Sequence, residues 1–170
     1  SIGMADLGRI EHELVLQKDK ILNSSNKPAL YAFVSDKVKV EKIVPGYNPQ
    51  VLEHLIKNFN YKAIILESYG VGTIPIIEEY SLLPMIRKAV ESGVIIVIGT
   101  QCSDGATWGK YYETATEAIN AGAIPGYDLL TETSYVKLCW VLGKENDPQK
   151  IKDLFLTNIS GELQTNSNSS

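Results

Sequence analysis

Two short loops hold the residues of this chain whose types and spacing could do chemistry. The first, ESYGVGTIP at Glu67–Pro75, follows an apolar run and contains two glycines separated by one residue. The second, GTQCSDG at 99–105, contains Cys102. A glycine-rich turn can cradle a phosphate, and a cysteine activated by a histidine can attack a carbonyl carbon. Nucleotide binding and covalent catalysis are therefore the first chemistries to weigh.

The glycine loop departs from the known phosphate motifs. A dinucleotide fingerprint is GxGxxG running directly into a helix, whereas Pro75 stands at the third glycine position. Several residues also separate the loop from the next predicted helix, so the helix N-terminus that attracts phosphate is missing. We expect Gly70 and Gly72 to permit positive φ at a strand-to-helix turn. A purely conformational role for the glycines does not explain why Tyr69 and Thr73, which we expect to be exposed, are present in this loop.

Cys102 has no evident activating partner. The chain has two histidines, His54 on the polar side of a predicted helix and His12 in the irregular N-terminal part. We expect Cys102 to be a small buried thiol, because free cysteine is among the most buried residue types. Two histidines and two cysteines at unrelated spacings fit no zinc pattern. We expect no metal, no cofactor and no self-sufficient catalytic set.

The elements that must position these loops alternate between strand and helix. The strands are predicted at 29–34, 38–46, 61–67 and 94–98, and the helices at 48–58, 81–92, 114–121, 131–142 and 147–158. In the helix at 131–142, Val136, Cys139 and Trp140 are expected to face inward. The pattern indicates an α/β fold, a three-layer, doubly wound, mainly parallel, Rossmann-like sheet in a single domain. Both loops then lie at the carboxyl ends of strands, where ligands bind in such folds.

The domain organisation follows from the same pattern. Residues 1–27 are expected to form an interdomain linker with a hairpin around Lys18–Lys20, residues 28–160 the α/β domain, and residues 161–170 a flexible polar tail. The net charge of −4 gives no electrostatic reason to bind nucleic acid. No apolar run has the length of a membrane span, and the start has no signal-peptide pattern. Two cysteines favour free thiols in a reducing cytoplasm.

Four ordered motifs give the chain a resemblance to a known family. They are ILESYGVGTIP, GTQCSDG, AGAIPGYDLLTETSYVKLCWVLG and LTNISGEL. Together they resemble the C-terminal domain of type I L-asparaginases, which hydrolyse the side-chain amide of asparagine. KIVPGYNP resembles the strand and turn before the first helix of that domain, and SIGMADLGRI the stretch that leaves the N-terminal domain.

The resemblance implies a divided active site. In that family the attacking threonine and a Thr–Asp–Lys set lie on the N-terminal domain, in GGTI and HGTDT motifs that are absent from this sequence. The chain alone is therefore expected to be inert. In the homo-oligomer, a dimer or tetramer, the glycine loop approaches the neighbouring subunit's pocket, which assigns L-asparagine contacts in trans to Tyr69, Gly70, Gly72 and Thr73. Thr73 replaces an asparagine of the family and keeps a hydroxyl without the amide.

A second set of residues matches an effector site for asparagine in some bacterial cytoplasmic members: Glu67, Thr100, Gln101 and Cys102. There an arginine clamps the effector's carboxylate, and the opposite charge of Glu67 argues against the same activation. Two other functions remain open. TETSYVKLCWVLG also resembles a subunit of the archaeal amidotransferase that makes Gln-tRNA, and the chain could be a stand-alone module that binds a small ligand.

Overall fold

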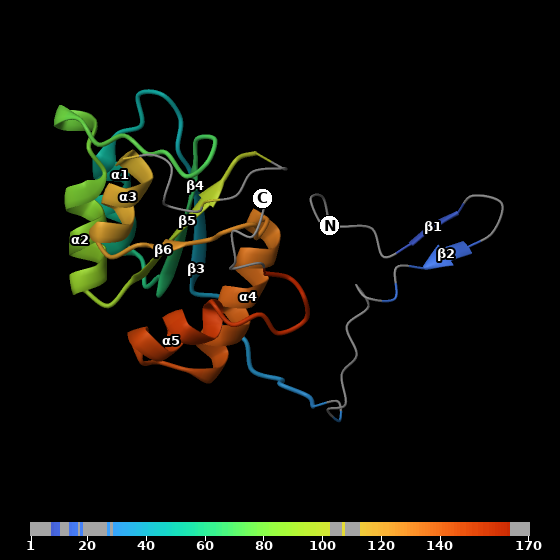
Figure 1. Cartoon of the computed structure of the whole chain (residues 1–170). Helices are drawn as coiled ribbons and strands as arrows, with labels where there is room; N and C mark the ends of the chain where they lie inside the picture. The colour runs from blue at the N-terminus through green and yellow to red at the C-terminus, as the bar shows by residue number, and fades with distance from the viewer. Residues whose placement is uncertain are drawn as a thin grey trace.

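The computed structural model of the chain describes residues 8–10, 14–16, 18, 27, 29–102, 107 and 113–163. Figure 1 shows the elements. The strands are β1 (Gly8–Ile10), β2 (Leu14–Leu16), β3 (Val38–Lys42), β4 (Ala63–Ser68), β5 (Ile95–Thr100) and β6 (Ile124–Pro125). The helices are α1 (Pro49–Asn58), the short 3₁₀ helix η2 (Glu78–Tyr80), α2 (Leu83–Glu91), α3 (Glu113–Asn120), α4 (Thr131–Lys144) and α5 (Pro148–Phe155). Within the described residues, no helix has both the length and the apolar character needed to cross a membrane.

A parallel sheet in the order β3-β4-β5-β6 forms the centre of the fold. In the two central strands, Ile64 pairs with Ile96 and Leu66 with Ile98. Residues 63–66 and 95–98 are buried on both faces, which explains why these strands are apolar runs without alternation. The aligned strand ends place the loops after β4 and β5 side by side.

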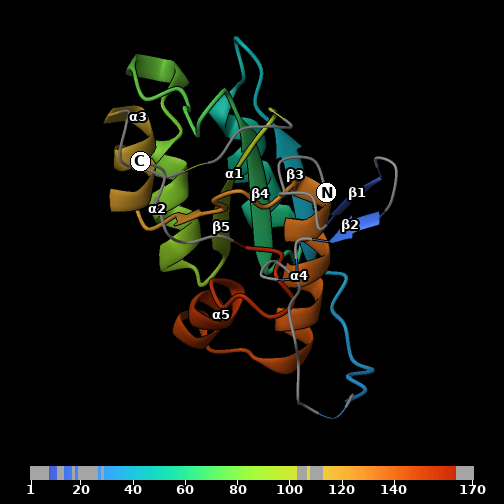
Figure 2. The same cartoon turned by 45° about the vertical axis from the view of Figure 1, so that its right-hand side comes forward.

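Helices cover both faces of the sheet and confirm the predicted three-layer α/β class. Helices α1, α2 and α3 lie on one face and α4 on the other, with α5 packed against α4 (Figures 1 and 2). The strands follow one another across the sheet in chain order. Each connection between neighbouring strands is a right-handed crossover, and all three step across the sheet in the same direction, so their helices lie on one face. The third layer is formed by α4 and α5, which follow the last strand.

The starts of α1 and α5 agree with the helices predicted to begin at residues 48 and 147. The Asn48 side chain accepts a hydrogen bond from Gln50 N at 3.0 Å, and Pro49 follows as the first helical residue. The Asp147 side chain accepts from Lys150 N at 2.9 Å, with Pro148 next. Each cap satisfies a backbone donor that the helix leaves unpaired, and each proline has no such donor.

The predicted strand at 29–34 was wrong. Residues 29–36 form no ladder and run as an extended strap beside α4 (Figure 1). The backbone of Ser35 donates to the carbonyl of Cys139 at 2.8 Å. A Cβ at position 143 would collide with the carbonyl of Phe33. A glycine inside α4 therefore lets the strap approach the helix backbone closely, a role that a propensity argument does not predict.

The inward face predicted for α4 was also wrong in part. Val136 is 65% exposed, and Cys139 and Trp140 are half-buried. The residues that pack on the sheet are Leu138, Val141 and Leu142, together with the polar Ser134 and Lys137. Lys137 is buried on this face with its ammonium paired to Glu162, so the buried face of α4 is rotated away from Val136.

The ends of the domain differ from the prediction as well. Strands β1 and β2 pair antiparallel, Ile10 with Leu14, so these paired strands precede the hairpin that was predicted around Lys18–Lys20. At the other end, Leu163 is buried in the core and Glu162 pairs with Lys137. The folded unit thus passes the predicted boundary at residue 160 and includes Gly161–Leu163, which had been assigned to a flexible tail. Residues 164–170 of that tail lie outside the described residues.

Candidate functional site

The loops that follow β4 and β5 meet at the carboxyl edge of the sheet. Ser68 and Thr100 are the last paired residues of these strands. The ladder is extended by one hydrogen bond from Gln101 N to Ser68 O at 3.1 Å. This geometry confirms that the two sequence loops with candidate chemistry are neighbours in space.

The glycine loop is a closed turn. Tyr69 N donates to Thr73 O at 2.9 Å, and Thr73 N and Gly72 N both donate to Tyr69 O at 3.0 Å. Gly70 has φ 45° and Gly72 has φ 106°, as expected from the sequence. These bonds fix the relative positions of Tyr69 and Thr73 at the base of the turn and leave Gly70 exposed at its tip. We refer to Tyr69–Thr73 as the Tyr69 turn.

Gly72 lies against the protein interior. A Cβ built on it would approach Cβ and Cγ2 of Thr107 to 3.3 Å and Cγ2 of Ile98 to 3.6 Å. Thr107 is itself fixed, because its Oγ1 donates to Ile98 O at 3.0 Å and its N donates to Tyr127 O at 2.9 Å. Position 72 therefore requires glycine for two reasons: its φ is positive, and a side chain would have too little room.

The loop after β5 braces the Tyr69 turn. Thr100 Oγ1 donates to Gly70 O and accepts from Cys102 N at 3.0 Å. Gln101 Nε2 donates to Glu67 O at 2.9 Å and to Ile43 O at 2.6 Å. Residues predicted for substrate contact and for effector binding thus form one hydrogen-bonded unit. The hydroxyl of Thr100 and the amide nitrogen of Gln101 are already used to hold backbone carbonyls.

A shallow pocket of about 350 Å³ opens beside the turn. Tyr69 and Thr73 form one wall, and the segment from Ile74 to Glu78 with Tyr80 and Thr114 forms the rest. Burial raises the pKa of the Tyr69 phenol, so this hydroxyl keeps its proton at neutral pH and can donate a hydrogen bond. The lining is otherwise largely apolar, so the pocket presents few polar groups.

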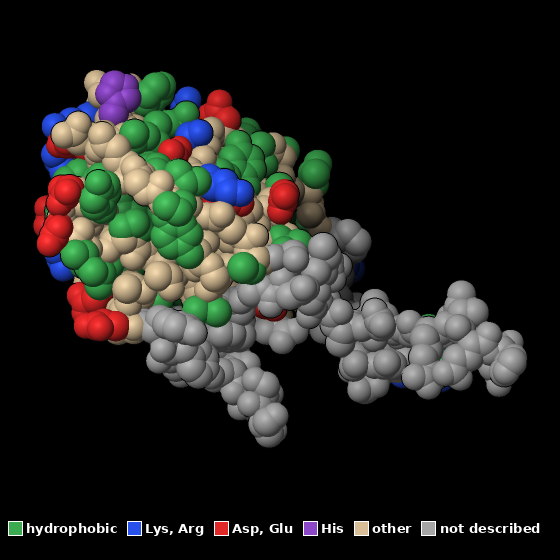
Figure 3. Space-filling view, turned by 90° about the horizontal axis from the view of Figure 1, so that it is seen from above, with side chains coloured by type: hydrophobic (Ala, Val, Ile, Leu, Met, Phe, Trp, Pro, Cys, Tyr) green, Lys and Arg blue, Asp and Glu red, His purple; other side chains and the backbone are tan. Residues whose placement is uncertain are grey.

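Figure 3 shows the carboxyl edge of the sheet from above. Acidic side chains gather at the side of α1, α2 and α3, on the left, and the basic side chains make no continuous stripe across the visible face. A surface that follows a nucleic-acid backbone needs such a stripe. The view therefore gives no support to a nucleic-acid interface on this face.

Other candidate residues lie apart from this edge or outside the described residues. His54 is exposed on α1 and its Nδ1 lies 3.0 Å from Asn58 Nδ2. Cys102 is exposed and unpaired, which contradicts the buried thiol expected from the sequence, because it follows the last strand residue into the loop. Cys139 is also a free thiol. His12 lies outside the described residues. Among those that are described, no group of three or more His, Cys, Asp or Glu could hold a metal ion.

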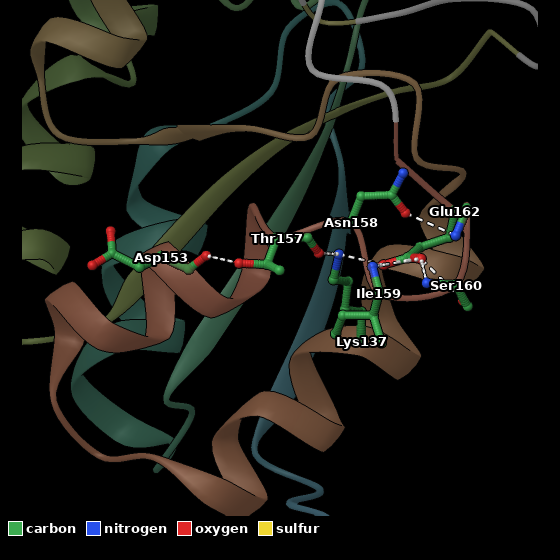
Figure 4. A network of polar contacts seen from close by, with 8 residues as sticks. Lys137, Asp153, Thr157, Asn158, Ile159, Ser160 and Glu162 are labelled. Carbon is green, nitrogen blue, oxygen red and sulfur yellow. Dashed lines mark hydrogen bonds and ion pairs between the residues drawn. The ribbon is translucent and has the colours of Figure 1, made fainter. Parts of the chain in front are cut away.

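A second polar centre, which the sequence did not predict, joins α4 to the C-terminal loop, residues 156–163 (Figure 4). Lys137 Nζ donates to Glu162 Oε1 at 2.6 Å and to Thr157 O at 2.7 Å. Glu162 also accepts from Ser160 N at 2.7 Å and from Ile159 N at 3.2 Å. A useful signal was present: Lys137 lies one residue before Leu138 and three after Ser134, on the buried side of a helix, and a buried lysine needs an acidic partner.

Burial alone would raise the pKa of Glu162, but the hydrogen bonds from Lys137 and from the backbone of Ser160 and Ile159 outweigh it and lower the pKa to about 2. The carboxylate is therefore charged throughout the neutral range. With its cation it clamps the C-terminal loop to α4. The centre has a structural function, because its donors and acceptors point at each other (Figure 4).

Comparisons with known proteins agree with this geometry. The family model described as Glutaminase/Asparaginase C-terminal domain matches residues 37–155. The thermostable L-asparaginase from Thermococcus kodakarensis is similar with a TM-score of 0.86 and 28% identity, over 96% of this chain and 49% of that chain. L-asparaginase I from Vibrio cholerae O1 biovar eltor gives 0.84 and 26%, again over 96% and 49%.

A similar curated protein is not named as an asparaginase. It is a glutamyl-tRNA(Gln) amidotransferase subunit from Pyrococcus furiosus, 38% identical over 130 residues, which make up 76% of this chain and 28% of the relative. The chain thus spans about half of each similar solved chain and less than a third of this relative.

Proposed function

The chain belongs to the glutaminase/asparaginase C-terminal domain family, and from this premise we propose that it acts as the C-terminal half of an L-asparaginase. In this role it supplies an oligomer surface and presents the Tyr69 turn to the active site of a neighbouring subunit. Asparagine and water would be the substrates, and aspartate and ammonia the products. The proposed domain comprises residues 28–163, preceded by a linker at 1–27.

The braced Tyr69 turn is the observation that carries this proposal. Its backbone is closed by reciprocal bonds between Tyr69 and Thr73 and is held from behind by Thr100 and Gln101. A loop fixed in this way can offer Tyr69, Thr73 and the exposed backbone of Gly70 to a partner with little loss of conformational entropy on binding. In this proposal Gly72 shapes the turn from within.

The effector residues have a related role in the proposal. Thr100 and Gln101 already hold carbonyls of Gly70, Glu67 and Ile43, which favours bracing over binding of a free amino acid. Glu67 and Cys102 complete this edge of the sheet, with Cys102 exposed. An effector at this edge would act by moving the brace and with it the Tyr69 turn.

The reaction itself is assigned to a partner domain. The GGTI and HGTDT motifs that carry the family's threonines are absent from this sequence, so the chain alone is proposed to be inactive. Its partners are the N-terminal catalytic domain and further copies of the same protein. Free thiols at Cys102 and Cys139 support a reducing compartment, the cytoplasm.

One observation favours a second candidate. The curated relative is an amidotransferase component at 38% identity, above the 28% of the Thermococcus kodakarensis L-asparaginase. In this alternative, the chain is the corresponding domain of a protein that releases ammonia for a partner acting on Glu-tRNA(Gln). Ammonia release that requires a tRNA-bound partner distinguishes it from an asparaginase.

The test is an ammonia-release assay with asparagine. We expect no turnover by the chain alone, and turnover when it is joined to the N-terminal part of the Thermococcus kodakarensis L-asparaginase. In the joined protein, Thr73→Ala should raise KM more than it lowers kcat if the hydroxyl binds ground and transition states alike. Ser92→Ala, at the far end of the sheet, is the control.

Two results would contradict the proposal: enzymatic turnover by the chain alone, or kinetics of Thr73→Ala equal to those of Ser92→Ala. Calorimetry covers the remaining alternative. Heat released when the isolated chain binds asparagine, aspartate or a nucleotide would instead support a stand-alone binding module.

A further inference from the structure

An apolar groove lies between α4 and the C-terminal loop. It has a volume of about 470 Å³, with Val136 and Trp140 on one side and Ile159 on the other. Val136 is 65% exposed and Ile159 is 51% exposed. Contiguous exposed apolar surface of this kind marks interaction sites more often than isolated apolar residues do.

The charged groups at the groove already satisfy each other. Lys137 and Glu162 line it, with side chains only 6% and 15% exposed. Lys137 donates to Glu162 and to the carbonyl of Thr157, and its ammonium lies 5.7 Å from the centre of the Phe155 ring. Since this ion pair is used internally, it offers little to a polar ligand. The groove therefore suits an apolar occupant.

The strap indicates where such an occupant would come from. Tyr31 packs edge-on against Trp140 with ring centres 5.8 Å apart, and Lys144 Nζ lies 3.7 Å and 4.1 Å from these two ring centres. Trp140 thus contacts the strap and also lines the groove. The strap therefore lies against the same helix that forms one wall of the groove (Figures 1 and 2).

The strap itself carries further unpartnered apolar surface. Leu30 is 91% exposed and Phe33 is 80% exposed. The strap that contacts Trp140 thus adds two exposed apolar side chains to this region of the domain. In the two similar L-asparaginase chains, about half of the length lies outside the match. A C-terminal domain that matches one half of such chains must meet the other half at some surface, and the groove is an apolar surface beside the strap.

We propose that the groove between α4 and the C-terminal loop is the docking surface for the preceding, N-terminal domain, which inserts an apolar segment between Val136 and Ile159. This inference rests on the proposed function, because it takes the two-domain organisation from there. The Lys137–Glu162 pair acts as the support of the groove: it fixes the C-terminal loop, and with it Ile159, at a constant distance from α4. Interfaces between domains of one chain commonly have such a mixed, partly apolar character.

The experiment joins the N-terminal part of the Thermococcus kodakarensis L-asparaginase to this chain and compares amide hydrogen exchange with that of the chain alone. We expect α4 and residues 156–163 to exchange roughly tenfold more slowly in the joined protein. Val136→Lys combined with Ile159→Lys should abolish this protection. The control is Val51→Lys, an exposed valine on α1, which should leave the protection unchanged.

The double variant is expected to fold, because both positions are exposed and a lysine at 136 can pair with Glu132 one turn earlier. Unfolding of the isolated variant checks this, and Val136→Thr with Ile159→Thr replaces it if stability falls. Protection that persists in the variants would overturn the proposal. So would the absence of added protection in the joined protein, or protection in the chain alone that disappears when residues 1–27 are removed, since the groove would then hold the chain's own N-terminal segment.

Ammonia release measured on the same samples separates the two proposals. If the joined protein hydrolyses asparagine but the groove exchanges freely, the docking proposal fails and the proposed function stands. If the groove is protected and sensitive to the lysine variants but asparagine is not hydrolysed, the docking surface stands and the proposed function fails.

Discussion

Two loops of this domain are held in place by different chemistry. The Tyr69 turn is fixed by neutral groups that donate to backbone carbonyls, from Thr100 and Gln101. The C-terminal loop is fixed by a buried ion pair, Lys137 with Glu162. A neutral brace loses little when one bond is removed, whereas a buried charge without its partner is costly. Both loops are therefore fixed, but only the C-terminal loop depends on a buried charge for its position.

The largest effect is expected where the charge is buried. Glu162→Ala leaves Lys137 without its counterion and removes an acceptor from the backbone of Ile159 and Ser160. We expect a loss of roughly 3–5 kcal/mol in the free energy of unfolding, measured with urea. Glu145→Ala is the matched control, since Glu145 also accepts from two backbone donors but its nearest cation, Lys150, lies 3.9 Å away at the surface.

In Glu145→Ala we expect a loss of no more than about 1 kcal/mol. The combination Lys137→Met with Glu162→Gln should recover much of the stability, because neither charge then remains buried and unpaired. If Glu162→Ala and Glu145→Ala lose the same free energy of unfolding, the buried ion pair contributes no more stability than hydrogen bonds at the surface.

A pH titration sharpens the same comparison. The pKa of Glu162 is about 2 in the folded protein and 4.5 in its ordinary state. Since the pKa of Glu162 is lower in the folded protein, its contribution to the free energy of unfolding is complete above pH 4.5 and is lost as the pH falls toward 2. We expect wild type to lose roughly 1–3 kcal/mol more than Glu162→Gln over this range, after allowance for solvent screening. Glu53, also with a pKa of about 2 but at the surface, is present in both proteins and cancels. Parallel pH curves would contradict the assignment.

The sequence predicted the parts of the fold that depend on near neighbours. Apolar runs predicted β4 and β5, an asparagine or aspartate before proline predicted the starts of α1 and α5, and two glycines predicted positive φ in the Tyr69 turn. Each of these signals acts within a few residues, so it can be read without the tertiary structure.

The contacts that hold the candidate site are distant in sequence. Gln101 and Ile43 are 58 residues apart, and Lys137 and Glu162 are 25 apart. A local pattern assigns Val136 to the buried face of α4 and the residues of the strap to a strand, because it does not include these distant partners. Cys102 shows the same limit, since its exposure depends on where the chain leaves β5 and not on its residue type.

The next effect concerns the shape of the Tyr69 turn. Gly72→Val combines a φ of 106° with contacts of 3.3 Å to Thr107. We expect a loss of about 2 kcal/mol, seen as a lower melting temperature. Gly70→Asn is the control within the same turn, because Gly70 has φ 45° and nothing lies within 4 Å of its Cβ position. Asparagine tolerates this conformation, so Gly70→Asn should lower the free energy of unfolding by only a few tenths of a kcal/mol. Similar melting of the two variants would show that Gly72 is not held against Thr107.

The smallest effect tests the brace itself. Gln101→Leu removes the donors to Glu67 O and Ile43 O, and we expect a loss of about 1 kcal/mol, because Glu67 O keeps a second donor, Ile43 N at 3.0 Å. The amide hydrogens of Gly72 and Thr73 should exchange faster, since the end of β4 that precedes them is no longer hydrogen-bonded to the Gln101 side chain. Gln149→Leu removes a surface amide that bonds Asp153 at 2.8 Å and should change neither quantity. Unchanged exchange in Gln101→Leu would mean that the Tyr69 turn keeps its shape through its own backbone bonds alone, and that an effector at Gln101 has no route to Thr73 through this brace.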